Sequence, residues 1–128
     1  MAVRATMDSM DDVEVTHVEV MDVPEPGADA IVLDVREPDE WQRGHIAGAQ
    51  HIPLAQLPVR FDEIDADPPL YVICHAGGRS LKAAQYLARV GYEPINVNGG
   101  MLSWVAAGRP VVTDDSPEDT VPDAAQAP

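Results

Sequence analysis

Apolar residues in the middle of the chain fall into short runs of two kinds. Residues 30–35 (AIVLDV) and 70–74 (LYVIC) are rich in β-branched and aromatic side chains, which is typical of strands buried on both faces of a parallel sheet. Residues 80–90 instead repeat their apolar positions at helical spacing, and Gly91 stands where a helix would end. Strand, glycine-rich loop and helix are therefore expected in that order between residues 70 and 90.

The same alternation of strand and helix patterns continues along the chain. It predicts an α/β fold with a parallel sheet, helices on both faces, and a ligand site at the carboxyl ends of the strands. The further expected elements are an edge strand starting near Val13, a helical turn at 38–42, a brief strand at 50–52, a helix at 54–64 interrupted near Pro58, a strand at 94–97 and a helix at 101–107.

The length of 128 residues and a hydrophobic content of 45% suit one hydrophobic core and are too small for two ordinary domains. The two ends are acidic and carry no apolar periodicity, so residues 1–12 and 113–128 are expected to be disordered around a folded domain at 13–112. Nothing in the sequence resembles a signal peptide or a membrane span, and one cysteine cannot form an intrachain disulfide. These features favour a reducing cytoplasm without a membrane partner.

The net charge of −14 argues against nucleic acid as a partner. Much of this charge lies at the ends, because residues 1–22 and residues 113–128 each carry −5 and the middle of the chain only −4. Arg79, Lys82 and Arg89 fall in or just after the glycine loop. A local basic patch is therefore expected near the loop of an acidic molecule.

Cys74 ends the second apolar run and opens the stretch CHAGGRS. The glycines allow the loop to curl with its N–H groups pointing inward, and the helix that follows adds unsatisfied N–H groups and the positive end of a dipole. Such surroundings, together with Arg79, lower the pKa of a thiol, and the thiolate is the reactive form. The alternative for the thiol alone is a buried structural cysteine. The loop and helix after it favour a nucleophile.

Three motifs carry a family resemblance, in order from about Val13 to Val112. They are the loop CHAGGRS, the upstream segment LDVREPDEWQRGHIAGAQHIP and the downstream segment NGGMLSWVAAGRPV. Together they resemble a single-domain rhodanese, a sulfurtransferase of the thiosulfate sulfurtransferase type. The resemblance implies a rhodanese-like three-layer fold with a central five-stranded parallel sheet.

The resemblance also implies a persulfide cycle. Cys74 would take a sulfane sulfur from a small donor such as thiosulfate and pass it to a nucleophilic acceptor such as cyanide, a thiol or a protein. No cofactor is implied. The residues that would form the substrate-binding loop around Cys74 are His75, Ala76, Gly77, Gly78, Arg79 and Ser80. Because the chain has no second cysteine, the bound sulfur must leave to another molecule.

Two other functions compete with this interpretation. A thiol phosphatase or arsenate reductase also places a cysteine before a helix, but with five residues between the cysteine and its arginine, whereas four separate Cys74 from Arg79. The shorter loop favours a sulfur atom over a phosphoryl group. A sulfur-carrier or binding module of the same fold would need the same loop without turnover.

Other conspicuous residues have simpler interpretations, with the role of the His75 side chain left open. Asp34 and Arg36 are expected to form an ion pair or hydrogen-bond anchor rather than a catalytic pair. The remaining expectations are hydrogen bonds rather than metal ligation for His45 and His51, a tight turn at Gly99 and Gly100, and core positions for Trp41 and Trp104.

Overall fold

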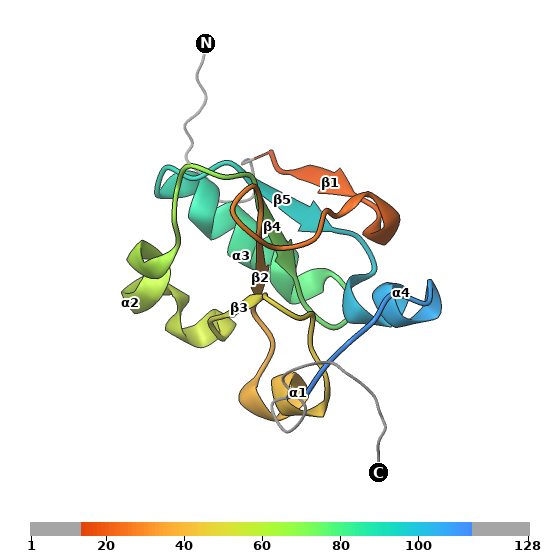
Figure 1. Ribbon diagram of the computed structural model, residues 1–128. Helices are drawn as coiled ribbons and strands as arrows, with labels where there is room; N and C mark the ends of the chain where they lie inside the picture. Colours follow the sequence, from red (N-terminus) through yellow and green to blue (C-terminus); the bar gives the residue numbers. More distant parts are fainter. Residues whose placement is uncertain (1–13, 114–128) are drawn as a thin grey trace.

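A single parallel sheet organises the chain in a computed structural model that describes residues 14–113. Within this range five strands lie in the spatial order β1-β5-β4-β2-β3, all parallel (Figure 1). Their bounds are β1 (Thr16–Val18), β2 (Ile31–Asp34), β3 (Gln50–His51), β4 (Leu70–Ile73) and β5 (Pro94–Val97). The central strands are apolar and almost fully buried, which is the pattern of a parallel sheet covered on both faces.

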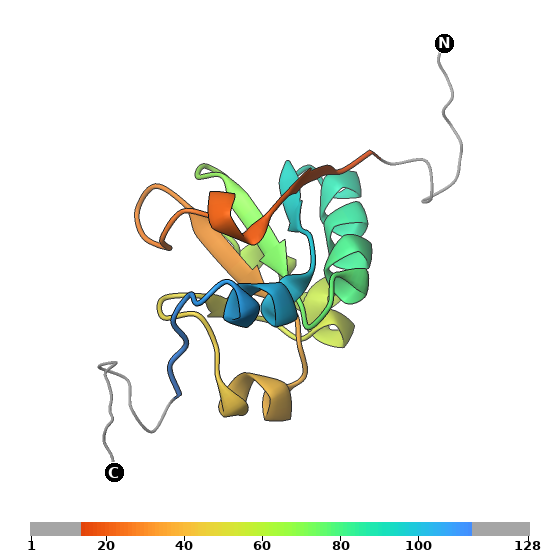
Figure 2. The same cartoon turned by 90° about the vertical axis from the view of Figure 1, so that its right-hand side faces the viewer.

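Helices cover the two faces of the sheet and give three layers (Figure 2). One hydrophobic cluster packs α3 (Gly78–Arg89) and α2 (Leu57–Arg60) against the sheet. The other packs the 3-10 helix η3 (Val20–Asp22) and α4 (Gly100–Ala106) against the opposite face. The expected α/β three-layer fold with five parallel strands is confirmed.

Helix α1 (Pro38–Arg43) stands apart from both faces, beyond the carboxyl ends of the strands (Figure 1). A buried ion pair fixes it there, because the guanidinium of Arg36 lies 2.8 Å from the Asp34 carboxylate at the end of β2 and donates to the Gly44 carbonyl at 2.7 Å. The anchor expected for this pair is present in the structure. Helix α1 thus faces the edge of the sheet where Cys74 emerges from β4.

Most predicted elements are present, with shifted bounds. The predicted helix at 54–64 is instead three pieces, the 3-10 helices η4 (Leu54–Gln56) and η5 (Phe61–Glu63) on either side of α2. Pro58 explains the break, because proline has no N–H to donate and fits only the first turn of a helix. The edge strand begins at Thr16 instead of near Val13.

The expected disordered ends, 1–12 and 113–128, lie outside the described residues except for Thr113. Within residues 14–113, no helix has both the length and the apolar character needed to span a bilayer. Over the same range, no group of three or more His, Cys, Asp or Glu side chains is placed to hold a metal ion.

Candidate active site

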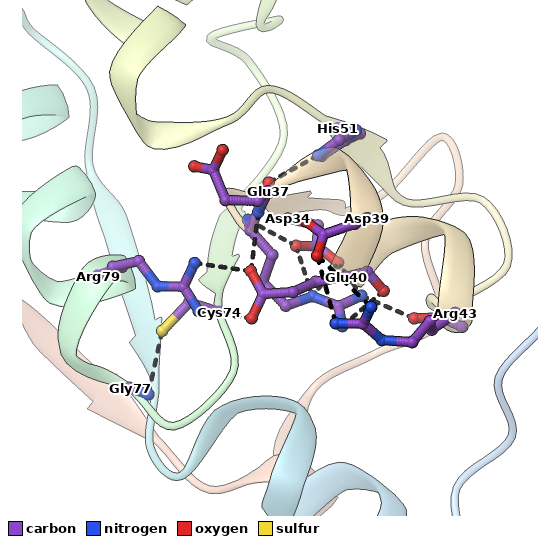
Figure 3. Close-up of polar contacts among 11 residues, drawn as sticks. Asp34, Glu37, Asp39, Glu40, Arg43, His51, Cys74, Gly77 and Arg79 are labelled. Carbon is purple, nitrogen blue, oxygen red and sulfur yellow. Dashed lines mark hydrogen bonds and ion pairs between the residues drawn. The ribbon is translucent and has the colours of Figure 1, made fainter.

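The thiol of Cys74 lies directly after β4, inside a loop whose backbone curls around it. Cys74 is 1% exposed, and the Gly77 N–H donates to its Sγ at 3.0 Å (Figure 3). Gly77 has φ +114°, in the left-handed region that side-chain-bearing residues rarely adopt, and it caps the start of α3. The loop geometry therefore depends on glycine at this position.

The surroundings of Cys74 favour its thiolate. Burial alone raises the pKa of the thiol, but hydrogen bonds from the hydroxyl and N–H of Ser80 and from the N–H groups of Gly77 and Ala76 bring the pKa below its usual value of 9.0. Backbone donors at the start of α3 are already oriented and need no rearrangement to bind an anion. The loop can hold a thiolate, or an anionic sulfur attached to it.

Helix α4 fixes the outer side of this loop. The N–H groups of Met101 and Leu102 donate to the carbonyls of Cys74 and His75 at 2.8 and 3.0 Å. Gly100 makes this approach possible, because a Cβ there would collide with both carbonyl oxygens. The tight turn expected at Gly99 and Gly100 is present, with φ of +77° and +57°. With the carbonyls held outward, the loop N–H groups are left to face the sulfur.

A buried polar pair supports the inner side of the loop. The Ser80 hydroxyl lies 2.6 Å from Asn96 Oδ1 on β5 and 3.1 Å from the Gly77 carbonyl, while Asn96 Nδ2 lies 3.2 Å from His17 Nδ1. A hydroxyl has one proton, so Ser80 donates at any moment to one acceptor among Asn96 Oδ1, the Gly77 carbonyl and the Cys74 sulfur. The close Asn96 contact makes backbone N–H groups the constant donors to the sulfur.

Arg79 turns away from the loop and binds helix α1. Its Nη1 and Nη2 lie 2.7 and 2.9 Å from Oε1 and Oε2 of Glu40, a bidentate ion pair (Figure 3). This pairing lowers the pKa of Glu40 to about 2 and raises that of Arg79, which also feels the Cys74 charge. Hydrogen bonds from Ser80, Gly77 and Ala76 lower the pKa of the Cys74 thiol, and the expected charge interaction between Arg79 and Cys74 acts in the same direction.

The loop opens into a cavity of about 400 Å³ between α1 and α4. His75 lines this cavity and is exposed; Ala76 is exposed as well, whereas Ser80 is buried. We call this space the α1–α4 cavity; the residues that line it are Arg36, Glu40, Arg43, Gly44, His75, Met101, Leu102, Val105, Ala106 and Val111. His75, the residue that follows Cys74, brings this cavity next to the loop.

Residues 19–107 match the rhodanese-like domain family. The chain belongs to this family. Among its relatives, the sulfurtransferase of Allochromatium vinosum is 34% identical over 88 residues, which cover 68% of this chain and 82% of that protein.

Two Bacillus subtilis relatives have higher sequence identity, but over shorter matched segments. The uncharacterized protein YqhL is 47% identical over 76 residues, or 59% of this chain, and the putative sulfur carrier protein YrkF is 42% identical over 74 residues, or 57% of this chain. The matched segments span 60% and 40% of the lengths of these two proteins.

Solved structures agree with the rhodanese fold. The crystal structure of a rhodanese-related protein from Thermoplasma volcanium has a TM-score of 0.72 and 35% identity, covering 77% of this chain and 99% of that one.

Two residues that contact the Cys74–Ser80 loop were not predicted from the sequence. Glu40 was treated as part of a short helical turn, although its place three residues after Glu37 in a capping box hinted at an ordered carboxylate. Asn96 is a buried polar residue inside an apolar strand, and such a residue needs a partner. Neither signal names the partner, because Arg79 and Ser80 lie far away in the sequence.

One structural expectation near the site was wrong. Trp104 is a core residue, as predicted, but Trp41 is only partly buried and belongs to neither core cluster. Its ring stacks on His45 and His51, with centroids 3.6 and 4.5 Å apart. Because α1 stands off the sheet, its tryptophan packs on these imidazoles. As expected, both histidines make hydrogen-bond contacts, His45 Nδ1 with the Trp41 carbonyl and His51 Nε2 with that of Arg36.

Proposed function

We propose that this chain is a sulfurtransferase that carries sulfane sulfur on Cys74. The observation that supports this best is the Cys74 sulfur buried in a ring of inward N–H donors, with the Gly77 N–H at 3.0 Å. Membership of the rhodanese-like family and the 34% identity to a sulfurtransferase support the same chemistry.

The first step is attack by the Cys74 thiolate on the outer sulfur of a donor such as thiosulfate. An Sγ–S bond forms, the S–S bond of thiosulfate breaks, and its electron pair leaves on sulfite. The product is an anionic persulfide, which the loop N–H groups can stabilise as they do the thiolate. A thiophilic acceptor, such as cyanide, a thiol or a protein, then attacks the outer sulfur and regenerates the Cys74 thiolate.

Intact mass spectrometry of the whole chain tests this proposal. Incubation with each of several sulfur donors should add the mass of one sulfur to the wild type and to Ser103→Ala, a control on α4, and nothing to Cys74→Ala. Because the chain has one cysteine, the adduct has a single assignment. Absence of a persulfide with every donor, together with hydrolysis of phosphate esters, would support the phosphatase alternative instead.

A sulfur-carrier role is the second candidate, favoured by 42% identity to a putative sulfur carrier protein. The same preparation separates the two functions. A persulfide that forms with one-to-one stoichiometry and turns over repeatedly with cyanide supports an enzyme. A persulfide that resists cyanide and small thiols but is released to a protein thiol supports a carrier.

A further inference from the structure

The arginines around the α1–α4 cavity are each matched by a carboxylate. Arg79 binds Glu40, and the same holds for the two arginines that line the cavity, Arg36 with Asp34 at 2.8 Å and Arg43 with Asp39 at 3.4 Å. Glu37 adds a further negative charge that acts on Arg79. Among the described residues, the positive charge of the arginines at the α1–α4 cavity is therefore largely neutralised, and little of it is left to bind a doubly charged anion.

Glu40 holds the decisive position in this arrangement. Its carboxylate lines the cavity and at the same time occupies both outer nitrogens of Arg79, the cation nearest to Cys74 in the sequence of the loop. The Glu40 side chain is 20% exposed, so solvent screens its charge only in part. A dianion approaching Cys74 meets this carboxylate and finds the fork of Arg79 already filled.

The opposite wall of the cavity is apolar. Its side chains on α4 and the following segment are Met101, Leu102, Val105, Ala106 and Val111. Val105 is 57% and Leu102 is 55% exposed, which is unusual for large apolar residues beside a polar loop. His75 lines the same cavity and directly follows Cys74, so this wall is continuous with the loop.

We infer that the sulfur donor is an organic hydropersulfide whose apolar group lies against α4, and that Glu40 selects against thiosulfate by occupying Arg79. This inference rests on the proposed function and specifies its donor. A hydropersulfide carries at most one negative charge on its sulfurs and has no sulfonate oxygens that need free cations. The Glu40 carboxylate and the apolar wall on α4 thus both favour an organic hydropersulfide.

The transfer step balances without any additional reactant. The Cys74 thiolate attacks the outer sulfur of R–S–SH. An Sγ–S bond forms, and the bond between the two sulfurs of the donor breaks. The electron pair leaves on the thiolate R–S⁻, which takes up the proton of the hydropersulfide. The products are the Cys74 persulfide anion and the thiol R–SH.

The first test compares three sulfur donors that carry different charges. Persulfide formation is followed by rapid quench and intact mass with thiosulfate, with methanethiosulfonate, which has one charge fewer, and with benzyl hydropersulfide. For Glu40→Gln, we expect kcat/KM to rise about 10-fold for thiosulfate, about 3-fold for methanethiosulfonate and less than about 2-fold for benzyl hydropersulfide. The gain for thiosulfate should shrink as salt is added.

Glu63→Gln is the matched control for this charge effect. Glu63 also forms a bidentate pair with an arginine, Arg60, at 3.0 Å for both contacts, but neither residue lines the cavity. The variant carries the same change in net charge and should leave kcat/KM unchanged for all three donors. An equal gain in both variants would trace the effect to net charge and overturn the role of Glu40.

The second test removes apolar surface from the cavity wall. Val105→Ser should lower kcat/KM for benzyl hydropersulfide about 3- to 10-fold and leave methanethiosulfonate unchanged, because only the benzyl group reaches the wall. Val59→Ser is the control, since Val59 is 81% exposed on α2 and outside the cavity. Equal loss for both donors would contradict contact with the organic group.

Failure of this inference is distinct from failure of the proposed function. If wild type forms its persulfide as fast from thiosulfate as from benzyl hydropersulfide, and Glu40→Gln changes nothing, the donor assignment is wrong and sulfur transfer stands. If no donor loads Cys74 in wild type, both proposals fail.

Discussion

Two segments meet at the ion pair between Arg79 and Glu40, and they bind charge with different groups. The loop Cys74–Ser80 presents backbone N–H groups and one hydroxyl to a buried sulfur. The segment Asp34–Gly44 presents carboxylates and guanidinium groups in pairs. Backbone donors do not titrate in the physiological range, whereas surface ion pairs respond to pH and salt.

This difference separates two parts of the site's chemistry. The loop determines how well sulfur is held as an anion, and its geometry depends on glycines and on α4. Under the proposed function, the α1 segment sets the charges that a sulfur donor meets beside the loop. Substitutions in one segment should therefore change the reactivity of Cys74, and substitutions in the other the choice of donor and the stability of α1.

The largest effect is expected from Asp34→Ala in the α1 segment. Asp34 is fully buried, and its loss leaves the Arg36 guanidinium buried with only carbonyl partners. Removing one partner of a buried ion pair typically costs about 3–5 kcal/mol, so the free energy of unfolding in urea should fall by that amount. The double variant Asp34→Ala/Arg36→Met should recover part of the loss, because it removes the unpaired charge.

Asp39→Ala is the control on the neighbouring helix. Asp39 and Arg43 form an exposed pair, which contributes less than about 0.5 kcal/mol. Similar losses for Asp34→Ala and Asp39→Ala would show that α1 is not anchored through the buried pair.

A smaller effect is expected from Ser80→Ala, which tests the loop. The substitution removes a hydroxyl whose one proton can go to the thiolate or to Asn96 Oδ1. The pKa of Cys74 should therefore rise, and the loss of the 2.6 Å contact with Asn96 should lower stability by about 1–2 kcal/mol. At a fixed pH below the pKa, less thiolate is then present and persulfide formation slows. Titration of the ultraviolet thiolate absorbance measures the shift.

Ser103→Ala provides the matching control for the loop, since Ser103 lies on α4 and is absent from the groups that set the Cys74 pKa. If the pKa of Cys74 is the same in wild type and Ser80→Ala, the backbone N–H groups stabilise the thiolate without the hydroxyl.

The comparison of segments also explains what the sequence could predict. The strand, loop and helix around Cys74 are contiguous, so apolar runs and glycines sufficed to predict the order of β4, the loop and α3. The pairing of Glu40 with Arg79 joins residues 39 positions apart and depends on where α1 docks. That docking follows from the buried Asp34–Arg36 pair, whose geometry is not encoded in local periodicity.

The same limit explains the errors in detail. Trp41 has a large apolar side chain of the kind that is often buried in a core. Whether it is buried there depends on whether its helix lies on a face of the sheet. Asn96 breaks an apolar strand, and only the structure shows that its partner is Ser80. Sequence patterns locate helices and strands. Which side chains on different elements contact each other is known only from how the elements pack.

The smallest expected effect is a pH dependence of the Glu40–Arg79 pair, which joins the two segments. The folded-state pKa of Glu40 is about 2, below its ordinary 4.5, because Arg79 donates to its carboxylate. A lowered pKa contributes stability that is present above pH 4.5 and is lost as pH falls from 4.5 towards 2. Because Arg79 is 34% exposed, screening reduces this contribution to about 1 kcal/mol.

In urea unfolding, Glu40→Gln should thus be less stable than wild type above pH 4.5, and the difference should vanish near pH 2. Glu63→Gln, which removes a more exposed carboxylate, should show a smaller change, and a Glu40→Gln deficit that persists at low pH would assign the loss to packing instead of charge.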